Sequence, residues 1–89
     1  MDEYEEILAS KRAIRVLSIV AEHRELTITE LARKAGIDHV IGDRIVRQLV
    51  EFDLLIDEYH GRNRLIRPNF RNYQILFVKD HGVETELIQ

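Results

Sequence analysis

The chain has 89 residues and no cysteine, with 45% hydrophobic and 33% charged residues, a composition that indicates one soluble globular domain and excludes disulfides and thiol chemistry. Its net charge of −3 argues at first against a nucleic-acid partner. No apolar stretch reaches the ~18 residues of a membrane span. The acidic start MDEYEEIL lacks the basic region of a signal peptide, so we expect a cytoplasmic protein with no membrane partner.

The first two predicted helices are marked by their capping residues. Ser10 suits the N-cap of a helix over residues 10–23, whose apolar residues recur at helical spacing. Thr27 and Glu30 have the spacing of a capping box, in which each side chain hydrogen-bonds a free backbone amide of the other residue. We expect a short second helix over residues 28–35, ended by Gly36 in a left-handed conformation.

A third helix is predicted over residues 38–52, capped by Asp38, whose charge suits the positive end of the helix dipole. On a helical wheel the residues separate into two faces. The inward face holds Ile41, Gly42, Ile45, Val46, Leu49 and Phe52. The outward face holds His39, Val40, Asp43, Arg44, Arg47 and Glu51. Because glycine lowers helix propensity by ~1 kcal/mol, we expect Gly42 to serve the close approach of a neighbouring helix.

A β-hairpin is predicted after the third helix, with strands Leu55–Tyr59 and Arg64–Arg67 joined by turn residues 60–63. Pro68 is expected to end the second strand because it cannot donate to the ladder. Residues 61–71 contain four arginines and no acidic residue. Contacts with phosphate are local and screened beyond ~10 Å, so this basic patch on an acidic body is compatible with nucleic-acid binding.

The last segment, residues 72–89, has two interpretations. It forms either a helix capped by Asn72 and ended by Gly82, or a hairpin that turns at residues 80–82. In both cases its apolar residues are expected to cover the core or a second subunit.

The order of helix, helix, turn, helix and hairpin is that of a known fold. The segments LTITELARKAGI and RIVRQLVEFDLL, followed by a hairpin turning at a glycine, resemble the winged helix-turn-helix of archaeal and bacterial transcription regulators of the ArsR/MarR-like kind. The resemblance covers roughly residues 10–68 and departs from the usual pattern at two positions. The family usually has a β-branched residue or leucine where this chain has Gly42, and glycine where it has Asp53, a residue type that can adopt a left-handed turn. It implies an α+β fold that is mainly α with a small β-hairpin, as a three-helix core plus a wing.

The implied domain organisation is a single winged-helix domain over residues 1–89. Residues 1–9 are an N-terminal extension, residues 10–68 the winged-helix core, and residues 69–89 a C-terminal segment that is a candidate dimerisation element. A small domain buries only a modest core, so a homodimer is expected.

The resemblance further implies a sequence-specific regulator of transcription that binds double-stranded DNA. The third helix would enter the major groove with its N-terminal residues at base edges, and the wing, residues 59–64, would lie on the backbone or in the minor groove. The expected contacts from the third helix are His39, Val40, Asp43, Arg44 and Arg47. Those from the wing are Arg62 and Arg64, and those from the start of the second helix are Thr27, Thr29 and Arg33.

Each candidate also has a structural interpretation. An arginine on an exposed helix face is usually solvated, and Asp43 can orient Arg44 or Arg47 instead of meeting a base. The wing arginines can pair with Asp57 and Glu58 across the hairpin, although contact with DNA is favoured for Arg62 and Arg64 because the tip extends beyond those acids. Thr27 is a capping residue before it is a DNA contact.

No catalytic residues, metal site or cofactor are predicted. His60 lies near two acids, but no set of three ligands with metal-binding spacing is evident, and no phosphate loop or catalytic triad is present. The alternative function is a protein-interaction winged-helix subunit of a larger macromolecular complex, which the net negative charge supports. The sequence leaves the operator, the regulated genes and any small-molecule effector unknown.

Overall fold

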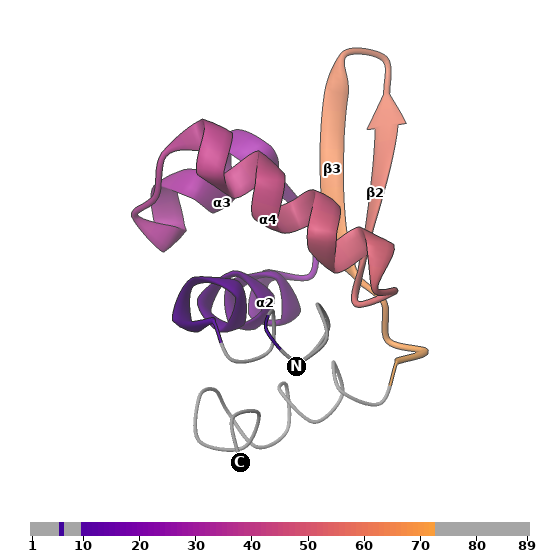
Figure 1. The fold of residues 1–89 in the computed structure, drawn as a ribbon. Coiled ribbons are helices and arrows are strands. Elements are labelled where there is room, and N and C mark those ends of the chain that lie inside the picture. The colour runs from indigo at the N-terminus through magenta and orange to yellow at the C-terminus, as the bar shows by residue number, and fades with distance from the viewer. Residues whose placement is uncertain (1–5, 7–9, 73–89) are drawn as a thin grey trace.

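The computed structural model describes residue 6 and residues 10–72, and the elements in these ranges follow the predicted order (Figure 1). They are α2 (Lys11–His23), β1 (Leu26–Thr27), α3 (Ile28–Ala35), α4 (His39–Glu51), β2 (Leu55–His60) and β3 (Asn63–Pro68). The predicted α+β class is therefore confirmed. The two alternatives for the last segment fall mainly on residues 73–89, which lie outside the described residues.

The predicted caps are all in place. The Ser10 hydroxyl accepts a hydrogen bond from the amide of Ala13 at 3.3 Å. Thr27 and Glu30 form the complete capping box at the start of α3. The Asp38 carboxylate accepts from the amide of Val40 at 2.7 Å. Since each cap satisfies an amide that the helix itself cannot, these local bonds determine where each helix begins.

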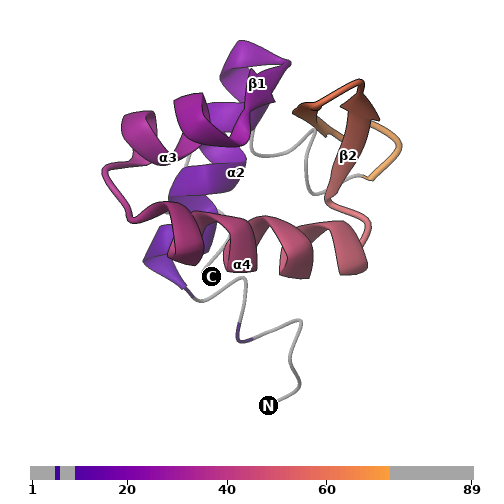
Figure 2. The ribbon, with the colours of Figure 1, turned by 90° about the horizontal axis from the view of Figure 1, so that it is seen from above.

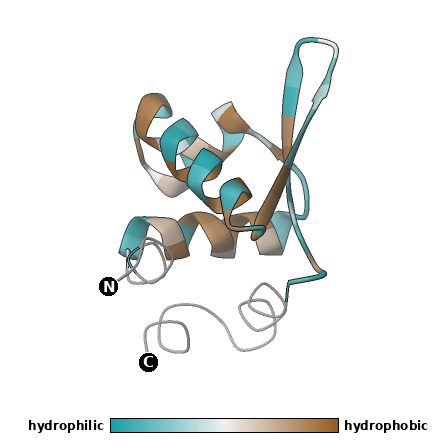
Figure 3. Ribbon diagram, turned by 45° about the vertical axis from the view of Figure 1, so that its right-hand side comes forward, coloured by the Kyte–Doolittle hydropathy of each residue, from teal (hydrophilic) through white to brown (hydrophobic). Residues whose placement is uncertain are grey.

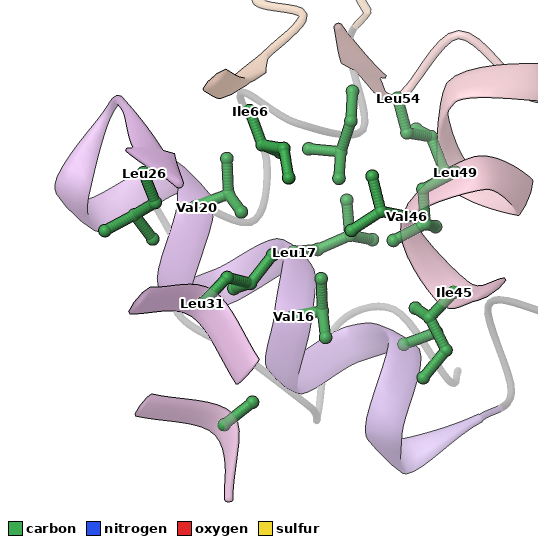
Figure 4. Close-up of a cluster of buried hydrophobic side chains, with 13 residues drawn as sticks. Val16, Leu17, Val20, Leu26, Leu31, Ile45, Val46, Leu49, Leu54 and Ile66 are labelled. Carbon is green, nitrogen blue, oxygen red and sulfur yellow. The ribbon is translucent and has the colours of Figure 1, made fainter. Parts of the chain in front are cut away.

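The core lies where the helices meet the base of the hairpin (Figure 4). Figure 4 shows Leu17 and Val20 of α2 facing Leu31, Leu49 and other side chains from the neighbouring elements. The side chains buried to less than 2% exposure and largest in volume are Ile14, Leu17, Leu31, Leu49, Leu54, Leu55, Ile66, Val16, Val20 and Val46. Each such side chain contributes about 1.5–3 kcal/mol by leaving water, which holds α4 and the hairpin in one body.

The sheet has a strand that the sequence did not indicate. Residues Leu26 and Thr27 pair with Ile66 and Leu65, so the sheet has the order β1-β3-β2 with antiparallel pairing throughout. A strand of two residues carries no visible alternation, which is why the pattern predicted a hairpin alone. The extra pairing ties the base of the hairpin to the chain entering α3.

The whole hairpin of β2 and β3, Leu55–Pro68, is called the wing from here on, and it extends well beyond the helices (Figure 1). Seen along its length in Figure 2, it lies beside the C-terminal part of α4. Its base is hydrophobic and its outer part is mostly hydrophilic (Figure 3). The wing is thus anchored by its base and presents its tip to solvent. Strand β3 ends at Pro68, as predicted.

Gly42 does not have the role that the sequence suggested. It is buried against α3, but a methyl group built at its position would meet Ala32 Cβ and Ile37 Cδ1 at 3.6 Å, which is ordinary van der Waals contact. A close approach that only glycine permits is therefore absent at this position. The departure at Asp53 is accommodated as expected, since Asp53 adopts a left-handed φ of 61° after α4.

Candidate nucleic-acid interface

The angle between α3 and α4 is set by a short turn with left-handed glycine. Gly36 has φ 67° and ends α3. The amide of Ile37 then donates to the Ala32 carbonyl at 3.1 Å, which closes the last turn of α3 before Asp38 caps α4. On the other side, Arg15 Nε of α2 donates to the Ala35 carbonyl at 3.2 Å. These bonds place α3 and α4 as a helix-turn-helix pair on top of α2.

The N-terminal part of α4 presents its predicted outer face to solvent. His39, Val40, Arg44 and Arg47 are exposed, whereas Asp43 is partly buried. Val40 is the most exposed of the large hydrophobic side chains in the described residues, at 70%. An exposed apolar side chain between a histidine and two arginines suits the edge of a base pair, where a thymine methyl lies beside hydrogen-bonding groups.

Asp43 is engaged by two arginines from different elements. Its Oδ2 accepts a hydrogen bond from Nε of Arg47, one turn along α4, at 2.8 Å. Its Oδ1 accepts from Nη1 of Arg64 on β3. The hydrogen bond from Arg64 is the main reason that the pKa of Asp43 lies below its ordinary value, and the bond from Arg47 adds to it. Asp43 therefore stays charged and bridges α4 to the wing.

Arg64 is where the structure departs most from the predicted site. Its side chain is 10% exposed, and its Nε and Nη2 both donate to Oδ2 of Asp57, at 2.9 and 2.8 Å. Burial by itself would lower the pKa of Arg64, but the bonds with Asp43 and Asp57 outweigh it and raise this pKa. The structural interpretation, pairing across the hairpin, thus holds for Arg64 in the free protein.

The outer part of the wing carries Arg62 and Tyr59, an aromatic residue for which no contact with DNA was predicted. Gly61 has φ 64° in the turn, and Arg62 beside it is exposed. Tyr59 is 66% exposed and lies directly opposite Arg64, so it shares the wing face that is turned toward α4. Strand alternation from Leu55 provides the signal that identifies this face. On the other face Arg67 is paired with Glu58.

At the start of α3 the three predicted contacts differ in how they are used. The Thr27 hydroxyl donates to Glu30 Oε1 at 2.9 Å and accepts from the Glu30 amide at 3.2 Å, so it is committed to the capping box. The backbone bond from Thr27 is also the main cause of a lowered pKa at Glu30. Thr29 and Arg33 are exposed and remain available to a ligand.

The described residues contain no group of three His, Cys, Asp or Glu side chains placed to hold a metal ion. His60 contacts Glu58 at 3.2 Å, as part of a surface pair. None of the helices in the described ranges is both long and apolar enough to cross a membrane.

The arrangement of α2, α3, α4 and the wing matches a solved structure. No family model matches the chain, and no curated protein matches it in sequence. A solved homodimeric winged helix-turn-helix DNA-binding domain from Mycobacterium bovis, a possible ArsR-family transcriptional regulator, superimposes with a TM-score of 0.70. The fold is a winged helix-turn-helix. The aligned part covers 83% of this chain and 66% of the mycobacterial chain, at 16% sequence identity, so the likeness concerns the fold. Within this fold, α4 is the second helix of the helix-turn-helix pair that it forms with α3.

Proposed function

We propose that this winged helix-turn-helix is a sequence-specific, double-stranded DNA-binding regulator of transcription. The observation that carries the proposal is the outer face of α4, where His39, Val40 and Arg44 are exposed near the N-terminal end of the recognition helix and Arg47 is exposed about one turn further along. In this fold that end of the helix meets base edges in the major groove. The solved neighbour, a DNA-binding domain, supports the proposal through its fold.

The side chains on α4 divide by the chemistry they offer to DNA. Arg44 and Arg47 can bond the O6 and N7 atoms of guanine, a contact that discriminates by about 1–3 kcal/mol. Val40 suits a thymine methyl, and His39 suits a base edge or a phosphate. Asp43 is assigned to orient Arg47 because its carboxylate is already engaged by arginines.

The wing and α3 supply contacts with the sugar-phosphate backbone. Arg62 at the tip is the wing residue assigned to phosphate or to the minor groove, with Tyr59 beside the same path. Arg64 is assigned to hold the wing against α4, because its departure would leave the partly buried Asp57 unpaired and would take one of two partners from Asp43. Thr29 and Arg33 are the exposed candidates on α3.

A homodimer is part of the proposal. The mycobacterial neighbour is homodimeric, and two recognition helices related by a twofold axis would read half-sites about 34 Å apart. The expected operator is therefore a pseudo-palindrome, and residues 69–89 are the proposed dimerisation element.

The proposal is tested by selecting bound duplexes from a random pool and then titrating the selected site at several salt concentrations. We expect Arg44→Ala to weaken binding and relax the preference at one base pair, and Arg62→Ala to weaken binding of every sequence. Loss of one phosphate contact should lower the slope of log K against log salt by ~0.9. Arg12→Ala, an exposed residue of α2, removes the same charge as a matched control. Equal binding by all four proteins would overturn the proposal.

One observation favours a second function, a protein-interaction subunit of a larger complex. Two of the arginines predicted for DNA are neutralised by aspartates, and the net charge is −3, so the surface is less basic than that of a typical DNA-binding domain. Negligible, salt-independent retention of the full chain on heparin and on duplex DNA would favour this function.

A further inference from the structure

Four charged side chains form one continuous chain between the recognition helix and the wing, which we call the Asp43 bridge. Its members are Arg47 and Asp43 on α4, Arg64 on β3 and Asp57 on β2, joined in that order by ion pairs. The signs alternate, so the bridge as a whole is neutral. It connects α4 with the wing, two elements that contact DNA in the proposed function.

The bridge holds Arg64 away from phosphate. Three of its guanidinium nitrogens donate to Asp43 and Asp57, and its side chain is 10% exposed. To reach a phosphate, Arg64 would have to leave Asp57 without an ion-pair partner and Asp43 with Arg47 alone. A less compensated charge in a partly buried place is unfavourable. Arg64 therefore makes no phosphate contact of the kind that would strengthen binding to every DNA sequence equally.

The bridge orients Arg47. The bond from its Nε to Asp43 Oδ2, at 2.8 Å, uses one edge of the guanidinium. The side chain is still 70% exposed, and the two Nη groups take no part in this bond. A long side chain that is already fixed by one bond loses less rotamer freedom when it binds a base. This smaller entropy loss strengthens binding only to a base pair whose acceptor atoms fit the position at which Arg47 is held.

We propose that Asp43 is a positioning residue that determines the specificity of DNA recognition. Its carboxylate repels phosphate and restrains Arg64 with every DNA sequence, while the Arg47 that it orients favours the matching base pair. Both effects widen the difference between the affinity for the operator and the affinity for random DNA. The inference rests on the proposed function. It adds that Asp43 acts through Arg47 and Arg64 and raises specificity while it lowers the affinity for DNA of any sequence.

The first experiment compares Asp43→Asn with Glu22→Gln, an exposed residue of α2 whose change alters the net charge equally. The readouts are the dissociation constants for the selected operator and for a random duplex, and their salt dependence. We expect Asp43→Asn to bind random DNA more tightly and to steepen the salt slope by about 0.9–1.8, as one or two further phosphates are engaged. The specificity ratio should fall about tenfold. Glu22→Gln should keep the ratio of the unmodified protein.

Two further variants separate orientation from folding and charge. Asp57→Asn has the same charge change inside the bridge and loosens Arg64, but it keeps the bond between Asp43 and Arg47. Its specificity ratio should therefore fall less than that of Asp43→Asn. Arg47→Lys keeps the charge and loses the Nε bond, so the ratio should fall while the salt slope is unchanged. These readouts do not depend on Asp43→Asn being stable.

The outcomes are distinct. If the unmodified protein discriminates operator from random DNA and Asp43→Asn keeps its ratio, the positioning role is overturned and the proposed function stands, whatever Arg47→Lys does. A ratio that falls equally in Asp57→Asn and Asp43→Asn would assign the effect to the wing and also overturn it. If the unmodified protein binds no duplex, the proposed function fails and this inference fails with it.

Discussion

Asp43 and Arg64 are joined by an ion pair, although 21 residues separate them along the chain. One belongs to α4 and the other to the wing, so the pair links two surfaces of the winged helix-turn-helix directly. The link is electrostatic and depends on the charge of one carboxylate, which gives it a pH dependence of known sign.

Acidification should weaken the link between α4 and the wing. The pKa of Asp43 is lowered in the folded protein, chiefly by the hydrogen bond from Arg64. A lowered folded pKa means that the stabilisation is present above the unfolded pKa, about 4, and is lost as the pH falls through the folded pKa. We expect the free energy of unfolding, measured with urea between about pH 2 and pH 6, to fall on acidification. The fall should be smaller in Asp43→Asn; an identical fall in both proteins would contradict the assignment.

Gly42→Ala should stabilise the protein. A methyl group at this position meets Ala32 and Ile37 at 3.6 Å, so it fits without displacing them, and alanine favours the helix over glycine by ~1 kcal/mol. We expect the free energy of unfolding to rise by up to that amount in chemical denaturation. DNA binding should be unchanged because Gly42 lies on the buried face of α4. A lower stability of Gly42→Ala would mean that α3 and α4 pack too closely to accept the added methyl group.

Gly36→Ala should have the opposite effect, although the surrounding space is open. No atom lies within 4 Å of a methyl group built at Gly36, but its φ is +67°. A residue with a Cβ is strained in this conformation by about 1–2 kcal/mol. We expect a loss of stability of that order in thermal or urea unfolding. Gly36→Asn should lose less, because asparagine tolerates the left-handed region; equal losses would point to a cause other than backbone strain.

Thr27→Ala tests whether Thr27 is a cap or a DNA contact. The hydroxyl accepts from the Glu30 amide and donates to the Glu30 carboxylate, and losing an N-cap side chain costs about 1 kcal/mol. We expect Thr27→Ala to lower the stability by that amount and Thr27→Ser to restore most of it. Operator binding, measured well below the melting temperature, should be nearly unchanged. A large loss of affinity with normal stability would identify Thr27 as a direct contact.

Tyr59→Ala should leave the fold intact and weaken binding to DNA. Tyr59 is 66% exposed, so its removal takes away little buried surface, and exposed substitutions usually change stability by less than about 0.5 kcal/mol. On the wing face turned toward α4, its ring and hydroxyl are available to the sugar-phosphate backbone. We expect an affinity loss shared by all sequences. Tyr59→Phe separates the hydroxyl from the ring, and unchanged binding in both variants would remove Tyr59 from the interface.

The helices and their boundaries were predictable because their signals are local. Thr27 and Glu30, three positions apart, hydrogen-bond each other in the capping box, and Gly36 ends α3 through the left-handed conformation of its own backbone. The buried face of α4 followed from helical periodicity alone, since Ile45, Val46 and Leu49 are buried where the wheel placed them. Information of this kind is contained within one or two helical turns, so the sequence was sufficient.

What only the tertiary structure decided is how distant segments meet. The pairing of Leu26 with Ile66 joins strands too far apart for any local pattern to reveal. The sequence likewise showed Arg64 in a basic run, and its neighbours along the chain favoured contact with DNA. Its actual partners depend on α4 lying beside the face of the wing that Arg64 and Asp57 share. An ion pair forms over a few ångströms in space and is indifferent to separation along the chain, so the sequence supplied the charges and the fold determined which of them meet.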